Sequence, residues 1–346
     1  MKIDHVHFYV DDAKVWRDWF VNHLGFTAVD SNINTIHTCT EVVNNGGVCF
    51  FLSSALLPTS PVAKFLNEHP PGVADVAFVI EDVEAAIALA QIHGAEVIQP
   101  IQEQQKGNVF LKWGKITAWG GLTHTLIERS QVNDEDSITS PLSIFTAIDH
   151  IVLNVAVGEL ESAVAWYEKI LDFQPQQSFK IQTDRSALYS QVMVSRNGSV
   201  QLPINEPASR NSQIQEFLNV NRGSGIQHIA LRTTNLISAI AQFRARGLSL
   251  LSVPQTYYSQ LKQRKQLPLS EAELEAIAQQ EILVDWQENA QKALLLQIFT
   301  QPIFGQPTFF FEFIERRYQA QGFGEGNFRA LFEAIESEQI KRGTLL

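Results

Sequence analysis

Three residues far apart in the chain have side chains of the types that bind a divalent metal. His150 and His228 each lie in a short apolar segment typical of a strand, and Glu312 lies in an apolar run, residues 309–314. A carboxylate buried in such a strand needs a metal, another cation or a proton, because burying it unpaired costs on the order of several kcal/mol. Glu315, beside Arg316, is the alternative carboxylate, and we expect it to be solvated.

Two imidazoles and one carboxylate on three strands form one face of an octahedron and leave three positions open. This set is typical of non-haem Fe(II) oxygenases, whose open positions take a chelating substrate and dioxygen. Zn²⁺ accepts the same donors, but its two-His, one-Glu sites usually include a His-Glu-Xaa-Xaa-His helix, which the sequence lacks. We therefore predict Fe(II), with Mn²⁺ or Co²⁺ as possible substitutes.

The two halves of the chain share a repeated pattern of segments. Residues 3–26 resemble 148–173, residues 72–94 resemble 225–247, and residues 125–129 resemble 312–316. The chain is therefore predicted to be a duplication. The alignment places His5, Asp75 and Thr125 of the first half opposite the three ligands of the second, so only the second half keeps a full set. We interpret His5 as a hydrogen-bonded core residue.

The pattern also predicts the domain organisation. A first domain at 1–130 without metal, an acidic, Ser-rich linker at 131–145 and a catalytic domain at 146–346 are expected. Residues 255–292 have no counterpart in the first half and are interpreted as an insertion carrying a surface helix that begins at Ser270. A terminal helix at 327–342 follows glycines on both sides of Phe323 and is interpreted as a lid.

Bulk composition excludes several classes of partner. The 346 residues carry a net charge of −11 and no long basic run, which argues against nucleic acid or anionic lipid as a partner. No apolar run approaches membrane-spanning length, and no signal peptide is recognisable, so we expect a cytoplasmic protein without membrane contact.

The second half closely resembles the 4-hydroxyphenylpyruvate dioxygenase family of the vicinal oxygen chelate superfamily. The matching stretches are residues 148–155, 203–207, 212–217, 225–231, 295–300 and 322–328. The first half is matched more weakly, at 4–10, 72–78 and 123–128. The resemblance implies an α+β fold of two tandem open β-barrels, each of paired βαβββ modules, with a C-terminal lid helix. It further implies a homodimer or homotetramer.

The resemblance assigns roles to particular residues. It implies that His150, His228 and Glu312 hold Fe(II), and that neutral polar side chains surround the substrate: Ser190, Asn205, Gln213, Gln227 and Gln297. Phe299, Phe323 and Phe328 are implied as apolar walls and lid of the aromatic-ring pocket. The chain departs from the family near Tyr189 and at residues 317–320, which bears on the fit of the substrate and not on the metal site.

The implied reaction converts 4-hydroxyphenylpyruvate and O2 to homogentisate and CO2, in tyrosine catabolism or in quinone and tocopherol synthesis. Hydroxymandelate synthase uses the same substrate and metal ligands and is the nearest alternative. A metal-free binding protein of the same fold has no reason to keep the triad in one half. An extradiol dioxygenase is expected to have a further His or Tyr near the metal, and the second half has no third His.

Overall fold

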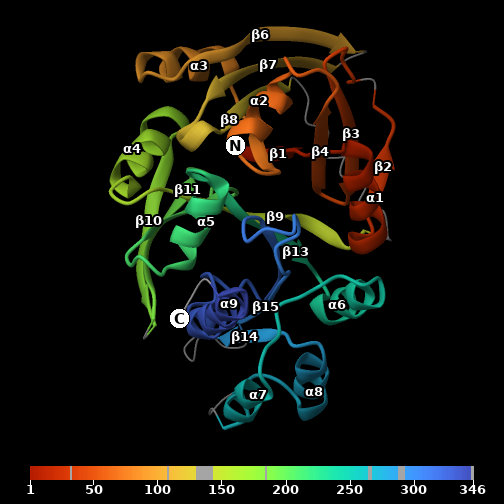
Figure 1. Cartoon of the computed structure of the whole chain (residues 1–346), viewed down its shortest axis with the longest axis vertical. Coiled ribbons are helices and arrows are strands. Elements are labelled where there is room, and N and C mark those ends of the chain that lie inside the picture. The colour runs from red at the N-terminus through yellow and green to blue at the C-terminus, as the bar shows by residue number, and fades with distance from the viewer. Residues whose placement is uncertain are drawn as a thin grey trace.

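The computed structural model describes residues 1–31, 33–106, 109–129, 143–183, 185–263, 267–286 and 293–343. Within these, the side chains of residues 106, 325, 328–331 and 333 are outside the description. Each half of the chain forms one eight-stranded sheet. Figure 1 shows the first half, red to yellow, in the upper part of the molecule and the strands and helices from β13 to α9 in the lower part.

The first sheet has the strand order β2-β3-β4-β1-β5-β8-β7-β6. Its strands are β1 (Lys2–Tyr9), β2 (Thr27–Val29), β3 (Thr38–Asn45), β4 (Val48–Ala55), β5 (Gly72–Val79), β6 (Val97–Lys106), β7 (Val109–Thr117) and β8 (Thr123–Arg129). Its helices are α1 (Ala13–Leu24), α2 (Pro61–Glu68), α3 (Val83–Ile92) and the short η1 (Trp119–Gly121).

The second sheet repeats this arrangement in the order β10-β11-β12-β9-β13-β16-β15-β14. Its strands are β9 (Phe145–Asn154), β10 (Phe173–Gln182), β11 (Ala187–Ser195), β12 (Gln201–Pro207), β13 (Gly225–Thr233), β14 (Leu283–Trp286), β15 (Leu294–Phe299) and β16 (Phe310–Arg317). Its helices are α4 (Leu160–Leu171), α5 (Gln213–Asn221), α6 (Leu236–Ala245), α7 (Gln255–Leu261), α8 (Glu271–Gln279), η3 (Glu325–Asn327) and α9 (Phe328–Arg342).

Each sheet is built from two βαβββ modules whose first strands pair with each other. In the first half β1 pairs antiparallel with β5, and each also pairs in parallel with the last strand of its own module, β4 or β8. In the second half β9, β13, β12 and β16 repeat these pairings. The ends of each strand order remain apart, so the prediction of two tandem open barrels of paired modules is confirmed.

The crossover helices of the second modules begin at the same kind of cap in both halves. Asp82 caps α3 and Asn235 caps α6. A Glu from the last strand adds a second acceptor: Glu128 Oε2 accepts from the Val83 amide at 3.0 Å, and Glu315 Oε2 accepts from the Leu236 amide at 2.7 Å. The expectation that Glu315 is solvated was therefore wrong, because the N-terminus of α6 and Arg317 stabilise its buried carboxylate.

The interpretation of residues 255–292 as an insertion needs a correction. Helices α7 and α8 have no counterpart in the first half, and Ser270 caps α8 as expected by accepting from the Glu273 amide. Strand β14, however, lies beside β15 in the second sheet as β6 lies beside β7 in the first. Its four residues were too few to show a strand pattern in the sequence.

The predicted linker, residues 131–145, lies mostly outside the described residues, which resume at residue 143. Strand β9 already begins at Phe145, inside the predicted linker. The terminal helix predicted at 327–342 corresponds to α9.

Aromatic side chains join the two halves behind strand β16. The ring of Phe311 lies 5.7 Å from that of Phe50, 5.9 Å from that of Phe20 and 6.4 Å from that of Phe8, all in the first half. Because side chains alternate along a strand, Glu312 faces the opposite side of the sheet. The first half thus packs against the back of a strand that carries a predicted ligand. No helix in the described part of the chain has the length and hydrophobicity to span a membrane.

Candidate metal centre and substrate pocket

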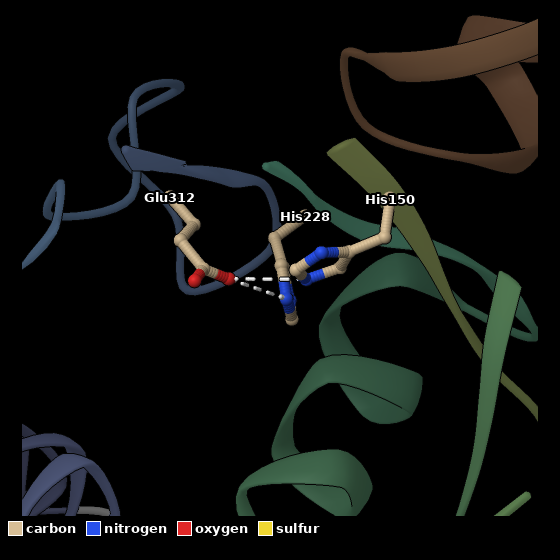
Figure 2. Close-up of side chains that lie close together, drawn as sticks. All are labelled: His150, His228 and Glu312. Atoms are coloured by element: carbon tan, nitrogen blue, oxygen red, sulfur yellow. Dashed lines mark ion pairs between the residues drawn. The ribbon is translucent and has the colours of Figure 1, made fainter. Parts of the chain in front are cut away.

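The three predicted ligands meet at one point on the second sheet. In the strand register, Ala230 on β13 is paired with His150 on β9 and with Glu312 on β16, and His228 is two residues from Ala230 on the same face. The small Ala230 side chain leaves space between the larger ones. Figure 2 shows the two imidazoles and the carboxylate pointing toward one another from three strands.

The donor atoms of this cluster are close enough to share an ion. His150 Nε2 lies 3.1 Å and His228 Nε2 lies 3.7 Å from Glu312 Oε2, and all three ligand atoms lie within 4.8 Å of one another. Ligands about 2.1 Å from a metal at right angles to each other stand about 3 Å apart. In the described residues this is the one group of three His, Cys, Asp or Glu side chains arranged in this way.

Hydrogen bonds orient each ligand. Gln297 Nε2 donates to Glu312 Oε1 at 2.8 Å and to the Phe323 carbonyl at 3.0 Å, and Asn327 Nδ2 donates to Gln297 Oε1 at 3.1 Å. His150 Nδ1 lies 3.0 Å from Asp149 Oδ1, and His228 Nδ1 lies 3.3 Å from Gln227 Oε1. Both imidazoles therefore turn Nε2 toward the centre of the cluster, as a metal site requires.

The electrostatics of the cluster favour a positive charge at its centre. Burial lowers the pKa of His150, but Glu312 and Asp149 oppose this effect and raise the pKa to about 9. Burial and the neighbouring His150 hold the pKa of His228 well below its usual value. Two nitrogen donors and one buried carboxylate fit a divalent ion, so the chemistry of the donor set agrees with the predicted metal.

A β-bulge brings two consecutive residues of β13 to the cavity. The pairing of β13 with β9 shifts register between Ile226 and His228, so that Gln227 has no paired residue on β9. Gln227 and His228 consequently both line the pocket. The first half has the same shift between His7 and Phe8, and there Ala74 is the extra residue on β5.

The pocket beside the cluster encloses about 630 Å³, part of it open to solvent. Seven of the eight residues predicted around the substrate line it: Ser190, Asn205, Gln213, Gln227, Gln297, Phe299 and Phe323. The side chain of the eighth, Phe328, lies outside the described residues, and its backbone begins α9. Ser190 and Asn205 are paired across β11 and β12, and Gln213 begins α5 after its cap, Ser212.

The structure places Gln297 differently from the expectation for a substrate-facing amide. Both of its amide hydrogens are donated to protein acceptors, and its oxygen accepts from Asn327. The side chain therefore holds Glu312 in place and ties the segment around Phe323 to the cluster.

Several apolar pocket residues were missed by the sequence analysis. Val152, Val192, Pro203 and Phe310 lie two residues from His150, Ser190, Asn205 and Glu312, respectively. Because every second side chain of a strand faces the same side, this spacing was a usable signal. Phe310 also stacks on His228, with ring centroids 4.7 Å apart and an interplanar angle of 16°.

The corresponding position in the first half is filled by a different polar cluster. Comparison of the β5–β8 register with the β13–β16 register makes Asp75 equivalent to His228 and Thr125 equivalent to Glu312, as the sequence alignment predicts. Asp75 is fully buried and accepts from Thr123 at 2.6 Å and from Thr125 at 2.8 Å. Lys115 Nζ lies 3.4 Å from Asp75 Oδ1, so an ammonium group supplies the positive charge in this half.

Comparison with known proteins places both halves in one superfamily. Residues 4–111 and residues 147–264 each match a model of the Glyoxalase/Bleomycin resistance protein/Dioxygenase superfamily. A mutant of 4-hydroxymandelate synthase from Streptomyces coelicolor has a similar structure, with a TM-score of 0.84, 25% identity and 98% coverage of both chains. Fold and site thus define a protein of the vicinal oxygen chelate type.

Curated relatives identify the family within this class. A 4-hydroxyphenylpyruvate dioxygenase from Coccidioides posadasii is 39% identical, with 99% of this chain and 94% of the relative covered. Its counterpart from Caenorhabditis elegans is 36% identical, with 99% and 93% covered. The chain belongs to the 4-hydroxyphenylpyruvate dioxygenase family and is an enzyme.

Proposed function

We propose that this enzyme is an Fe(II)-dependent dioxygenase that converts 4-hydroxyphenylpyruvate and O2 to homogentisate and CO2. The observation that carries the proposal is the convergence of His150, His228 and Glu312 on the lining of a pocket that also has aromatic and neutral polar groups. Bound Fe(II) would supply the activation of O2 and the positive charge that the 2-oxo acid group of the substrate needs. The family relatives support both the substrate and the use of O2.

The charge of the pocket lining supports a metal-dependent substrate site. The described lining residues include no Lys or Arg, and Glu312 is their one carboxylate. Among the described residues, no ammonium or guanidinium group is therefore available in this pocket for a substrate carboxylate. Neutral hydroxyl and carboxamide groups can orient polar groups of the substrate without competing for the ion.

Four polar side chains are available to bind the substrate. Ser190 and Asn205 lie on neighbouring strands, Gln213 faces them from the start of α5, and Gln227 stands beside the ligand His228. We assign these groups to the orientation of the phenol and keto oxygens. Gln297 acts on the substrate indirectly, because its amide fixes Glu312.

Aromatic residues complete the pocket and exclude water. Phe299, Phe310 and Phe323 are each less than a tenth exposed, and the ring of Phe323 packs edge-on against His150 at 5.2 Å. Phe332 and Ile335 of α9 also line the cavity. The wall of the pocket thus includes the terminal helix, in agreement with its proposed role as a lid.

We also propose a division of labour between the halves. The first half, to residue 130, is structural and supports β16 through Phe311, and the second half is catalytic. The Asp75, Thr125 and Lys115 cluster supports this assignment, because its own hydrogen bonds and ion pair satisfy the buried carboxylate.

The test is anaerobic reconstitution with Fe(II), addition of 4-hydroxyphenylpyruvate and then of air, with products separated by chromatography and identified by mass. Homogentisate and one CO2 per turnover are expected. The matched control is Glu312→Gln, which keeps the side-chain size and removes the charge, and it should give no product. Iron-loaded protein that consumes no oxygen with this substrate would refute the proposal.

One alternative has a specific observation in its favour, which is the structural similarity to a mutant of 4-hydroxymandelate synthase over nearly the whole chain. The same experiment separates the two functions by product. If 4-hydroxymandelate is formed, the site assignment stands, and the position at which the substrate is oxidised changes.

A further inference from the structure

The carboxylate of Asp149 lies directly behind the predicted ligand His150 and is fully buried. Arg316 donates to it through Nη2 at 2.7 Å and Nε at 2.8 Å, and Arg232 donates through Nη2 at 2.6 Å and Nε at 2.8 Å. A carboxylate that receives four guanidinium hydrogen bonds is ionised and can only accept. His150 Nδ1, which lies 3.0 Å from Asp149 Oδ1, must therefore be the donor in that contact. In the neutral imidazole, which is the form that binds a metal, Nε2 then carries the lone pair.

Arg316 extends this contact to the segment before the terminal helix. Its Nη1 donates to the Gly322 carbonyl at 2.8 Å and to the Ala320 carbonyl at 3.2 Å. The turn contains two non-glycine residues in the left-handed region, Tyr318 with φ of 50° and Gln319 with φ of 57°. Such conformations cost about 1–3 kcal/mol each and persist where the surroundings hold them.

The contacts form a closed ring. Asp149 fixes His150, whose ring packs against Phe323, and Phe323 follows Gly322, which Arg316 holds. Arg316 returns to Asp149. One carboxylate therefore helps to fix both a ligand and the aromatic wall of the pocket.

We propose that Asp149 is a positioning residue that sets the orientation of the ligand His150 and, through Arg316, the position of Phe323. This inference rests on the proposed metal site. The contact distances above carry it, together with the rule that outer carboxylates orient ligand imidazoles and strengthen metal binding.

The first half contains a natural reference for this arrangement. His5 Nδ1 lies 2.8 Å from Asp4 Oδ2, and Arg129 Nη2 donates to Asp4 Oδ1 at 2.6 Å. These residues match His150, Asp149 and Arg316 in the repeat, but Val79 takes the place of Arg232. An Asp and His pair of similar geometry thus exists where the His has no predicted metal to bind.

The experiment compares Asp149→Asn with Asp4→Asn in the full-length protein. Co(II) is the probe, because its visible absorption reports both affinity and ligand geometry. We expect Asp149→Asn to weaken Co(II) binding roughly 10- to 100-fold and to change the spectrum. Asp4→Asn should leave both at the wild-type level.

Arg316→Lys is a second, separate variant that tests the same inference if Asp149→Asn fails to fold. Lysine keeps the charge beside Asp149 but cannot hold the carboxylate and two carbonyls together, so folded protein with an altered Co(II) spectrum is expected. Wild-type affinity and spectrum in both second-half variants would overturn the inference, as would an equal loss in Asp4→Asn. Absence of Co(II) and Fe(II) binding in the wild type would instead overturn the metal site and with it the proposed function.

Discussion

Gly324 lies where a side chain would collide with Gln297, whose amide hydrogen-bonds to the predicted metal ligand Glu312. Its φ of +77° is in the left-handed region, and a Cβ added there would overlap Gln297 Oε1 and stand 2.6 Å from Gln297 Cδ. Gln297 would have to move, which breaks its hydrogen bonds with Glu312, Phe323 and Asn327. Gly324→Ala is therefore expected to weaken both folding and metal binding.

The magnitude can be separated into two parts. The left-handed backbone costs any L residue about 1–2 kcal/mol. Three lost hydrogen bonds add about 1 kcal/mol each, and more for the one to the carboxylate. Gly247 is the matched control, because its φ is +79° and an added Cβ would meet nothing within 4 Å. We expect the free energy of unfolding to fall by about 4–6 kcal/mol for Gly324→Ala and about 1–2 kcal/mol for Gly247→Ala.

Urea unfolding of both variants, with Co(II) titration of the folded protein, measures these effects. The collision is tested further by adding Gln297→Ala, which removes the obstructing amide. In that background Gly324→Ala should cost no more than Gly247→Ala does. Equal losses for the two glycine variants in the wild-type background would refute the collision argument.

Three further predictions address the cluster, its counterpart and the buried His124 of β8, whose Nε2 lies 3.2 Å from the Tyr167 hydroxyl of the second half. Glu312→Gln should abolish Co(II) binding while circular dichroism shows a folded protein; retained binding would contradict the ligand assignment. His5→Ala should leave homogentisate formation within about twofold of the wild type, and a large loss would mean that the first half contributes more than support. Burial lowers the pKa of His124 to about 4, so between pH 6.5 and 4 the unfolded chain binds a proton that the folded chain does not. The free energy of unfolding should fall by about 3 kcal/mol as the pH falls through that window. Urea midpoints measured at pH 7, 5.5 and 4 should vary less with pH in His124→Gln than in the wild type. An equal pH dependence in the two proteins would show that other groups dominate.

The duplication predicted the division into two homologous halves because it supplies its own alignment, and the family resemblance supplied the open-barrel architecture. The repeated segments located the strands that carry His150 and His228 and matched Thr125 with Glu312, and the strand register agrees. The pattern failed at β14, where four residues carry too little periodicity. It also failed at Glu315, whose helix-capping partner is 79 residues away.

The polar residues of the site were predicted and several of its apolar residues were missed, for a physical reason. The resemblance to the family supplied Asn205 and Gln227, which are polar residues within largely apolar strands. Their apolar neighbours in the pocket have the same composition as core residues, and the bulge that turns Gln227 inward is a property of strand pairing. The contacts of Asp149 depend on arginines 83 and 167 residues away, which no local pattern reveals.

The positive charge beside Asp75 is the ammonium of Lys115, which is part of the chain. The two halves therefore differ in whether their buried charge can be lost to the solvent. A chelator or a shortage of metal would withdraw the proposed ion from the second half, but neither can withdraw a lysine side chain from the first. We therefore expect the first half to keep its internal charge balance at any metal concentration, so that starvation for the metal yields an inactive protein whose first half remains folded. Reloading would then require the second half alone to close around a new ion.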